Sequence, residues 1–530
     1  MFLTINFVLS LLSTGLMTSV AYYYYKYFTR VNPLPGPFPF PFIGVLPYVI
    51  WFKGDIEMFY NYCYEKYGDI YEINGSLRSI ILCRVEYIED LLSKSTCEMR
   101  CPNYKGIEEL GIEGKGLTYN NNFKSWAFNR YFFNQAILSP KFTNEVIFWT
   151  NELFNELEYY WDKLYLKEEI IKENKNKLDF IKWFSHYKND VIIKLLTGER
   201  SYTMAAYFST ISNEKSGYHP KRVEGSVKLV QAIRKLHRGY VFFFLIPSFL
   251  RRYVPFLKTM SDDIFQTMDF INQKLNTIIK TRRKEIEDAS LDEPLPHDML
   301  TSMIIKNTFR DVNYFETGEA SRFMTNSEIR VNLLDGFYSG TYKSANLLSF
   351  IIYYIAHNPN VKKKMLEEID SIFQGDKMRS ITKEDYYSLK YCEAIVKEVA
   401  RILPTMRFSR YTDKPSEIAG YRWPADTMFQ INVSAIHNND DYWKEPNKFN
   451  PDRWMDENFE PKKYTYIVFG EGLRLCPGRK LAMIEVVCLM ALLFRNYEIN
   501  LVDMNSPIKT MSDGILISCV ELLVEIKPRN

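Results

Sequence analysis

The chain has 530 residues, of which 46% are hydrophobic and 25% are charged. These values exclude a disordered or fibrous protein, and the length suits one large domain or about three average ones. Basic and acidic residues nearly balance, at 67 and 64, without a dense basic block, so no nucleic acid partner is expected. The eight cysteines have no regular spacing, which argues against a disulfide scaffold or structural zinc and favours a reducing compartment.

The amino-terminal residues 1–25 contain no charged side chain and are rich in Leu, Phe and Val. A run of this length can cross a bilayer as a helix, so it predicts a transmembrane anchor with a basic flank over residues 1–30. A buried helix is the alternative, because the run also contains several Ser and Thr residues. Lys26 and Arg30 follow the run, and the positive-inside rule then places the rest of the chain in the cytosol.

A proline-rich segment follows, with the sequence PLPGPFPFPFIG. Proline fixes φ and removes the backbone donor, so neither a helix nor an inner strand can continue through it. We predict a stiff spacer over residues 31–44 and a single large domain over residues 45–530.

The remaining chain predicts a mainly α fold with small β-sheets. The stretches YGDIYEI and SIILCRV, with turn residues between them, predict a hairpin. Amphipathic periodicity predicts helices over residues 144–164, 261–287, 327–357, 361–373, 389–403 and 479–494. Further strands are expected over residues 420–424, 427–433 and 514–526.

The stretch FGEGLRLCPG, residues 469–478, is the strongest chemical signal in the chain. Gly470, Gly472 and Gly478 allow the backbone to turn tightly around Cys476. A helix follows at once, and its amino terminus favours the thiolate form of a nearby cysteine. Taken alone, a glycine-rich turn before a helix is also typical of a simple cap or a phosphate-binding loop.

This stretch resembles the cysteine loop of the cytochrome P450 family, F-x-x-G-x-R-x-C-x-G. The matching residues are Phe469, Gly472, Arg474, Cys476 and Gly478. The resemblance extends from the proline-rich segment to the carboxyl end, and it implies the P450 fold with residues 45–530 as a haem-binding catalytic domain. It also implies haem b as cofactor, with Cys476 as the thiolate ligand of the iron.

Two further stretches match the family in the same order. Glu398 and Arg401 in KEVARILP, with Arg453 in FNPDRW, resemble a buried ion-pair cluster with a structural role. His437 matches a family position near the haem, but a lone histidine is more often a structural residue and it is left unassigned.

Four residues resemble the family's contacts to the haem propionates. Trp126 and Arg130 stand one helical turn apart in KSWAFNR, and Arg410 and Arg474 match two further positions. The planar arginine side chain suits a carboxylate, because it can donate two parallel hydrogen bonds.

The sequence departs from the family in SGTYKSANLL, where the distal helix is expected. Tyr342 occupies the position of the usual acid and Lys343 that of the usual threonine, so the family's proton relay is absent. Thr341 and Ser344 keep hydroxyl groups, displaced by about 100° around the helix. Lys343 can accept an acidic substrate, supply protons as an amine of lowered pKa, or turn away; we favour the last, with water and Ser344 as the relay.

A run of aromatic and aliphatic residues, 242–246, precedes Arg251 and Arg252. The combination fits either a contact with the bilayer surface or an ordinary buried segment.

The resemblance implies a monooxygenase that oxidises a lipophilic small molecule, such as a lipid, sterol, terpenoid or xenobiotic. Its expected partners are O2, membrane lipid and an NADPH-cytochrome reductase that delivers electrons near Arg479 and Lys480. The expected location is the endoplasmic reticulum membrane, with a single span and the catalytic domain in the cytosol. A thiolate-haem peroxide isomerase or lyase without a reductase, and a non-catalytic haem or ligand-binding relative, remain as alternatives.

Overall fold

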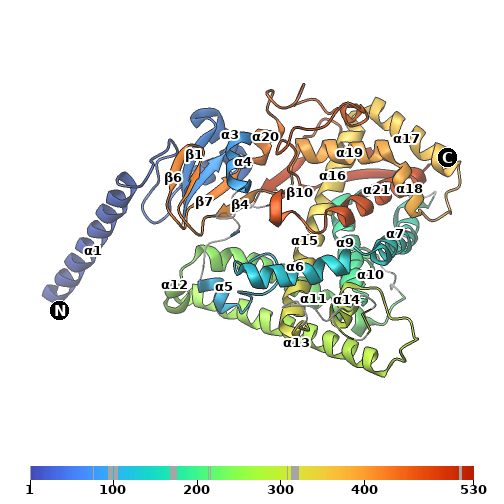
Figure 1. Ribbon diagram of the computed structural model, residues 1–530, viewed down its shortest axis with the longest axis horizontal. Coiled ribbons are helices and arrows are strands. Elements are labelled where there is room, and N and C mark those ends of the chain that lie inside the picture. The colour runs from blue at the N-terminus through green and yellow to red at the C-terminus, as the bar shows by residue number, and fades with distance from the viewer. Residues whose placement is uncertain are drawn as a thin grey trace.

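The computed structural model describes residues 2–75, 77–93, 99–100, 105–167, 176–212, 214, 217–306, 308, 310–311, 322–512 and 516–529. Most helices gather on one side of the molecule and the four-stranded sheet lies on the other (Figure 1). The helix α1 (Phe2–Phe28) extends away from the body beside that sheet. The expectation of a mainly α fold with small sheets is confirmed.

Long helices build the body of the molecule. They are α6 (Phe123–Ile137), α7 (Pro140–Trp161), α9 (Phe180–Thr197), α11 (Pro220–Leu245), α13 (Pro255–Asp288), α15 (Asn326–Gly340), α16 (Tyr342–His357), α17 (Pro359–Phe373), α19 (Lys390–Ile402) and α21 (Arg479–Asn496). The shorter helices are α2 (Leu46–Trp51), α3 (Ile56–Tyr67), α4 (Val85–Ser93), α5 (Lys105–Glu109), α10 (Thr203–Ile211), α12 (Ser248–Tyr253), α14 (Met299–Ile305), α18 (Lys383–Ser388) and α20 (Val433–His437). The largest hydrophobic cluster lies between the long helices, and α21 is buried along most of its length.

The strands form four small sheets. They are β1 (Ile70–Asn74), β2 (Arg78–Leu82), β3 (Lys177–Asp179), β4 (Phe408–Tyr411), β5 (Ser416–Ile418), β6 (Tyr421–Trp423), β7 (Met428–Ile431), β8 (Tyr497–Leu501), β9 (Lys509–Ser512), β10 (Ile517–Glu521) and β11 (Leu523–Pro528). The largest sheet has the order β1-β2-β7-β4, and only β2 and β7 pair in parallel. The predicted hairpin is β1 and β2, and the predicted later strands appear as β6, β7, β10 and β11.

The predicted helix over residues 327–357 is interrupted at one residue. α15 ends at Gly340 and α16 begins at Tyr342, so Thr341 stands between two helices. The helix α9 packs closely here: a Cβ atom on Gly340 would lie 2.7 Å from Cδ1 of Ile192. A larger residue than glycine would therefore push α9 away from the interruption.

The amino terminus forms the expected helix, but the transmembrane prediction is not supported. Among the described residues, no helix is both long and apolar enough to cross a membrane. Polar residues dilute the apolar run of α1, which contains Ser, Thr and Asn and ends in the sequence AYYYYKYF.

The apolar run 242–246 lies at the end of α11 and just after it, and of its residues whose burial is described Phe243 is buried and the others are half-buried. The nearby Arg251 is also buried and pairs with Glu109 at 2.7 Å. The exposed aromatic side chains come just after this run, at Phe249 and Tyr253.

Candidate active site

The cysteine loop has the geometry that its glycines predict at two positions. Gly470 and Gly472 both have φ of +73°, in the left-handed region that favours glycine. Gly478 has φ of −83° and serves instead as the residue preceding α21. The amide of Cys476 donates to the carbonyl of Phe469 at 3.0 Å, which closes the loop and presents the sulfur just ahead of α21.

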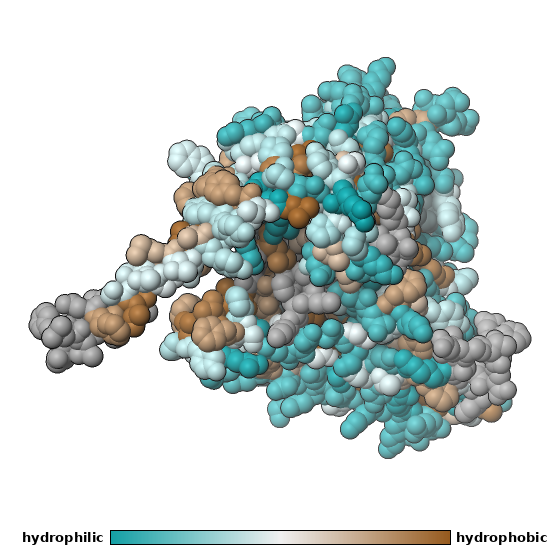
Figure 2. Space-filling view, turned by 60° about the vertical axis from the view of Figure 1, so that its left-hand side comes forward, coloured by the Kyte–Doolittle hydropathy of each residue, from teal (hydrophilic) through white to brown (hydrophobic). Residues whose placement is uncertain are grey.

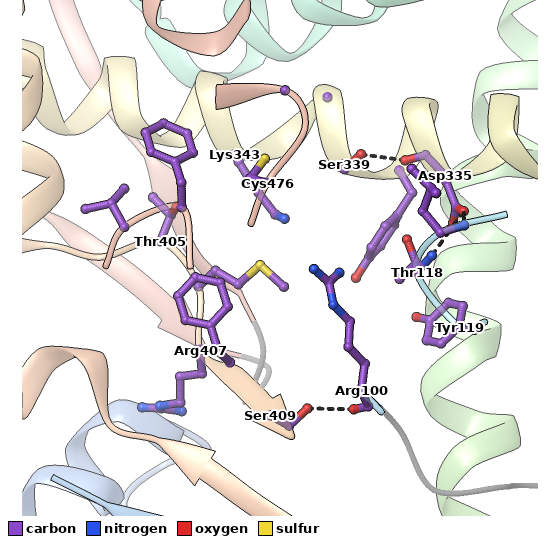
Figure 3. Close-up of a pocket in the computed structure, with 18 of the residues that line it drawn as sticks. Arg100, Thr118, Tyr119, Asp335, Ser339, Lys343, Thr405, Arg407, Ser409 and Cys476 are labelled. Carbon is purple, nitrogen blue, oxygen red and sulfur yellow. Dashed lines mark hydrogen bonds between the residues drawn. The ribbon is translucent and has the colours of Figure 1, made fainter. Parts of the chain in front are cut away.

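Cys476 faces a cavity of about 610 Å³ at the centre of the molecule. α15 and α16 lie along one side of the cavity and the cysteine loop along another, and β4 and the residues before it reach it from the sheet side (Figure 3). Phe469 and Gly478 also line it. A volume of this size suits a cofactor or a small apolar ligand.

Among the charged side chains on the wall of this cavity, cations outnumber carboxylates. Of the described residues that line it, five carry a cationic side chain and two carry a carboxylate; the cations are Arg100, Arg130, Lys343, Arg407 and Arg410, and the carboxylates are Asp335 and Glu485. Arg407 is paired with Glu57, and Glu485 with Lys188. The remaining cations give the cavity a surplus of positive charge, which suits an anionic ligand.

The predicted propionate contacts divide into two groups. Trp126, Arg130 and Arg410 line the cavity, and the Arg130 guanidinium also donates to the carbonyl of Leu475 at 2.7 Å. Arg474 does not line it: its guanidinium lies over the Trp126 ring, 4.2 Å from the centroid, and donates to backbone carbonyls of the segment before α6. Arg474 therefore supports Trp126.

The sequence reasoning missed Arg100. Its side chain reaches into the cavity and it donates to the carbonyl of Arg474 at 2.5 Å, while Ser409 donates to its backbone carbonyl (Figure 3). Burial, with Arg100 nearby, lowers the pKa of Arg130, as expected where two guanidinium groups converge without a bound anion. No periodic pattern surrounds Arg100 in the sequence, so only its position in space identifies it.

These residues fit a haem. A cysteine sulfur faces the cavity as a soft ligand for iron, three arginines and a tryptophan surround the cavity for two carboxylate arms, and apolar side chains such as Leu347 and Leu481 complete the wall. Gly472 lies in the short 3-10 turn Gly472–Arg474 and shapes the loop without lining the cavity.

The expectation that Lys343 turns away from the cavity is wrong. Lys343 and Ser344 line the cavity, whereas Thr341 and Tyr342 do not. Thr341 is buried and its hydroxyl donates to the carbonyl of Phe337, and the Tyr342 ring lies near Arg234, 5.8 Å from the centroid, on the α11 side. Lys343 therefore lies on the cavity wall and does not turn away from the cavity.

The predicted ion-pair cluster is confirmed as a buried network. Arg401 donates to both oxygens of Glu398, at 3.0 and 2.9 Å, and Arg453 donates to the same carboxylate at 3.2 Å. Arg401 also donates to the carbonyls of His437 and Pro446. Glu398 and Arg401 are both fully buried, so the network ties α19 to the loop that precedes the cysteine loop.

His437 is a structural residue next to this network. Its Nδ1 donates to the carbonyl of Arg401 at 3.1 Å, and its Nε2 accepts from the amide of Ile467 at 3.0 Å, which fixes the neutral tautomer. Burial lowers the pKa of His437 to about 3. A second proton would place an N–H against the Ile467 amide, so the folded protein resists protonation here.

We expect His437 to make the protein less stable in mild acid. The folded pKa is below the unfolded value of about 6.5, so only the unfolded chain takes up this proton between those values, and stability falls by about 1.4 kcal/mol per pH unit as pH falls through that range. Urea unfolding at about pH 7 and about pH 5 measures the slope. In His437→Gln the free energy of unfolding should depend less on pH, because the contribution of this histidine is gone. A pH dependence equal to that of the wild type would contradict the assignment.

A second buried ion pair includes Glu485, which lines the cavity. Lys188 on α9 pairs with Glu485 on α21, and both side chains are almost wholly buried. The sequence gives no signal for this pair, because a lysine in a helix interior usually marks a solvated face.

Comparison with known proteins agrees with this geometry. The family model for cytochrome P450 matches residues 34–527. The chain is similar to cytochrome P450 3A1 of Rattus norvegicus, with 26% identity over 90% of this chain and 87% of the relative, and to cytochrome P450 2L1 of Panulirus argus, with 24% identity over 82% of each. The crystal structure of the cytochrome P450DA heme domain superposes with a TM-score of 0.74 at 18% identity, covering 94% of this chain and 98% of that one. With the family model matching nearly the whole chain, the protein belongs to the cytochrome P450 family of haem-thiolate monooxygenases, which use cysteine-ligated haem b.

Proposed function

We propose that this enzyme inserts oxygen into a lipophilic small molecule bound in the central cavity, with Cys476 as the iron ligand. The observation that carries the proposal is that the sulfur of Cys476 faces a mostly apolar cavity ringed by Trp126, Arg130, Arg410 and Arg100. Haem b bound there supplies oxygen activation, which the protein side chains cannot perform alone.

The side chains have separate tasks in this proposal. Arg100, Arg130 and Arg410 hold the two propionates by charge-assisted hydrogen bonds. Gly470 and Gly472, with positive φ, allow the turn that presents the sulfur of Cys476 to the cavity. Ser339 and Ser344 are the hydroxyl residues of the described distal segment that line the cavity. The Ser339 hydroxyl already donates to the carbonyl of Asp335, so Ser344 is the group better placed to hold a water there and pass on protons.

Electrons would arrive at the opposite face of the cysteine loop. A second cavity of about 370 Å³ is lined there by Leu475, Cys476 and Pro477, with Arg479 and Lys480 exposed at its edge. A basic rim beside a thiolate suits an acidic reductase surface, and we propose an NADPH-cytochrome reductase as the donor.

We propose that α1 holds the enzyme at the endoplasmic reticulum membrane with the domain in the cytosol. α1 projects from the body of the molecule, and hydrophobic side chains lie on the surface near the point from which α1 projects (Figure 2). The exposed aromatic residues of α12 and of the start of α13 include Phe249, Tyr253 and Phe256, whose side chains are 67%, 72% and 65% exposed. Such side chains bind well at a bilayer surface.

This arrangement predicts two membrane contacts. Deleting residues 1–30 should leave part of the protein on membranes, and adding Phe249→Ser, Tyr253→Ser and Phe256→Ser should release most of that part. Sedimentation with vesicles measures both. Complete release by the deletion alone would leave α1 as the only contact.

The proposed reaction is tested by electron consumption. The purified full-length haem protein is combined with NADPH and a microsomal reductase, and a panel of apolar compounds is screened first for substrate-induced changes of the haem spectrum. Compounds that bind should accelerate NADPH consumption and appear as oxygenated products. If compounds bind without accelerating NADPH consumption, and hydroperoxides are consumed without NADPH, the protein is an isomerase or lyase. If neither assay shows turnover, it is a binding protein.

A further inference from the structure

Lys343 is a basic residue on the wall of the active-site cavity. It lines the same cavity as Cys476, and both residues are among those drawn around it in Figure 3. Lys343 makes no hydrogen bond or ion pair with any residue that the structure describes. Lys343 is half-buried against this cavity. A lysine in a mostly apolar cavity is usually paired, which favours a partner outside the protein chain.

The two carboxylates on the cavity wall do not serve as that partner. Asp335 accepts hydrogen bonds from the amides of Leu117 and Thr118, at 2.6 and 3.2 Å, and Glu485 pairs with Lys188. Both are already engaged, so a carboxylate of the cavity wall does not neutralise Lys343.

The position of Lys343 relative to Cys476 suggests what the partner is. Cys476 approaches the cavity from the loop before α21, whereas Lys343 approaches it from α16. Lys343 therefore reaches the cavity from a different element than the loop that would hold the iron, and its side chain is free to extend toward an iron bound by Cys476. The lysine side chain is long and flexible, and it ends in a nitrogen that can act as a ligand when it is neutral.

We propose that the side-chain nitrogen of Lys343 is a second protein ligand of the haem iron in the resting, substrate-free enzyme, opposite Cys476. The inference rests on the proposed haem site. On ligation the ammonium group releases one proton to solvent, and its nitrogen lone pair forms the bond to iron. The oxidation state of the iron does not change.

The surroundings of Lys343 favour a neutral amine. Burial lowers the pKa of Lys343, and the nearby Arg100 acts in the same direction, against an opposing effect of the Cys476 sulfur. Ligation also removes the cost of leaving an ammonium group in an apolar cavity. The ligating lysine would keep that face of the iron closed until a substrate displaces it.

Electron paramagnetic resonance of the ferric protein tests the ligand directly. The full-length haem protein is produced with lysine that carries the heavy nitrogen isotope and is measured without substrate. We expect a hyperfine coupling from lysine nitrogen in the wild-type protein and its complete loss in Lys343→Ala. Wild-type protein that lacks this coupling, or that has the same spectrum as Lys343→Ala, would overturn the proposal.

Lys343→Arg separates ligation from charge, because arginine keeps the cation but remains protonated and cannot ligate. We expect its ferric spectrum to match that of Lys343→Ala. If it matches the wild type, the lysine acts through its charge and the proposal is wrong. The reduced carbon monoxide spectrum, which depends on Cys476, must be equal in all three proteins, so a loss of the haem site is distinguished from a loss of the lysine ligand.

Discussion

Arg401→Met should destabilise the folded enzyme by about 3–5 kcal/mol, the usual result of breaking a buried ion pair. The change leaves the buried Glu398 with only Arg453 as a cationic partner, and it leaves the carbonyls of His437 and Pro446 without a donor. Typical domains have only about 5–15 kcal/mol of stability, so much of it would be lost. Urea unfolding followed by far-UV circular dichroism measures the effect.

Lys397→Met is the matched control on the same helix. Lys397 pairs with Glu393 at 2.8 Å, but both side chains are partly exposed to solvent. An exposed pair of this kind contributes about 0–1 kcal/mol. If the two variants lose equal stability, burial is not what makes the Arg401 network important.

Lys188→Met should cost a similar amount, about 3–5 kcal/mol, because it leaves the Glu485 carboxylate buried without its partner. Burial lowers the pKa of Lys188, which shows that the environment itself disfavours the charge. The pair therefore depends on the mutual attraction of its two members.

The double variant Lys188→Met with Glu485→Leu separates these contributions. Removing both charges also removes the desolvation cost, so we expect most of the stability to return, within about 1–2 kcal/mol of the wild type. The exposed pair of Lys228 and Glu224 on α11 supplies the control, since Lys228→Met should change stability by less than about 1 kcal/mol. A double variant as unstable as Lys188→Met would contradict this account.

The sequence predicted the elements whose patterns are local. The hairpin β1–β2, the helices α13, α17, α19 and α21, and the cysteine loop all follow from periodicity or from glycines that need a left-handed φ. α9 was missed because it is buried on nearly all sides and carries Lys188 and Asp190 in its interior, so it shows no apolar stripe.

The arrangement of the distal segment could not be read from the sequence. Tyr342 and Lys343 are adjacent, and which of them faces the cavity depends on how this segment packs against its neighbours, such as α9 at Gly340. Arg100 likewise depends on a fold that brings it to Arg474, 374 residues later in the chain. Contacts of this range are set by tertiary packing, not by local pattern.

The central claim is that Cys476 supplies the thiolate to the haem iron, and the carbon monoxide spectrum of the reduced protein tests it most directly. Cys488 is the control, because it is buried in α21 and does not line the cavity. We predict that the wild type and Cys488→Ala show the strongly red-shifted Soret band of a thiolate-ligated haem, and that Cys476→Ala lacks it. The same band in Cys476→Ala would contradict the account.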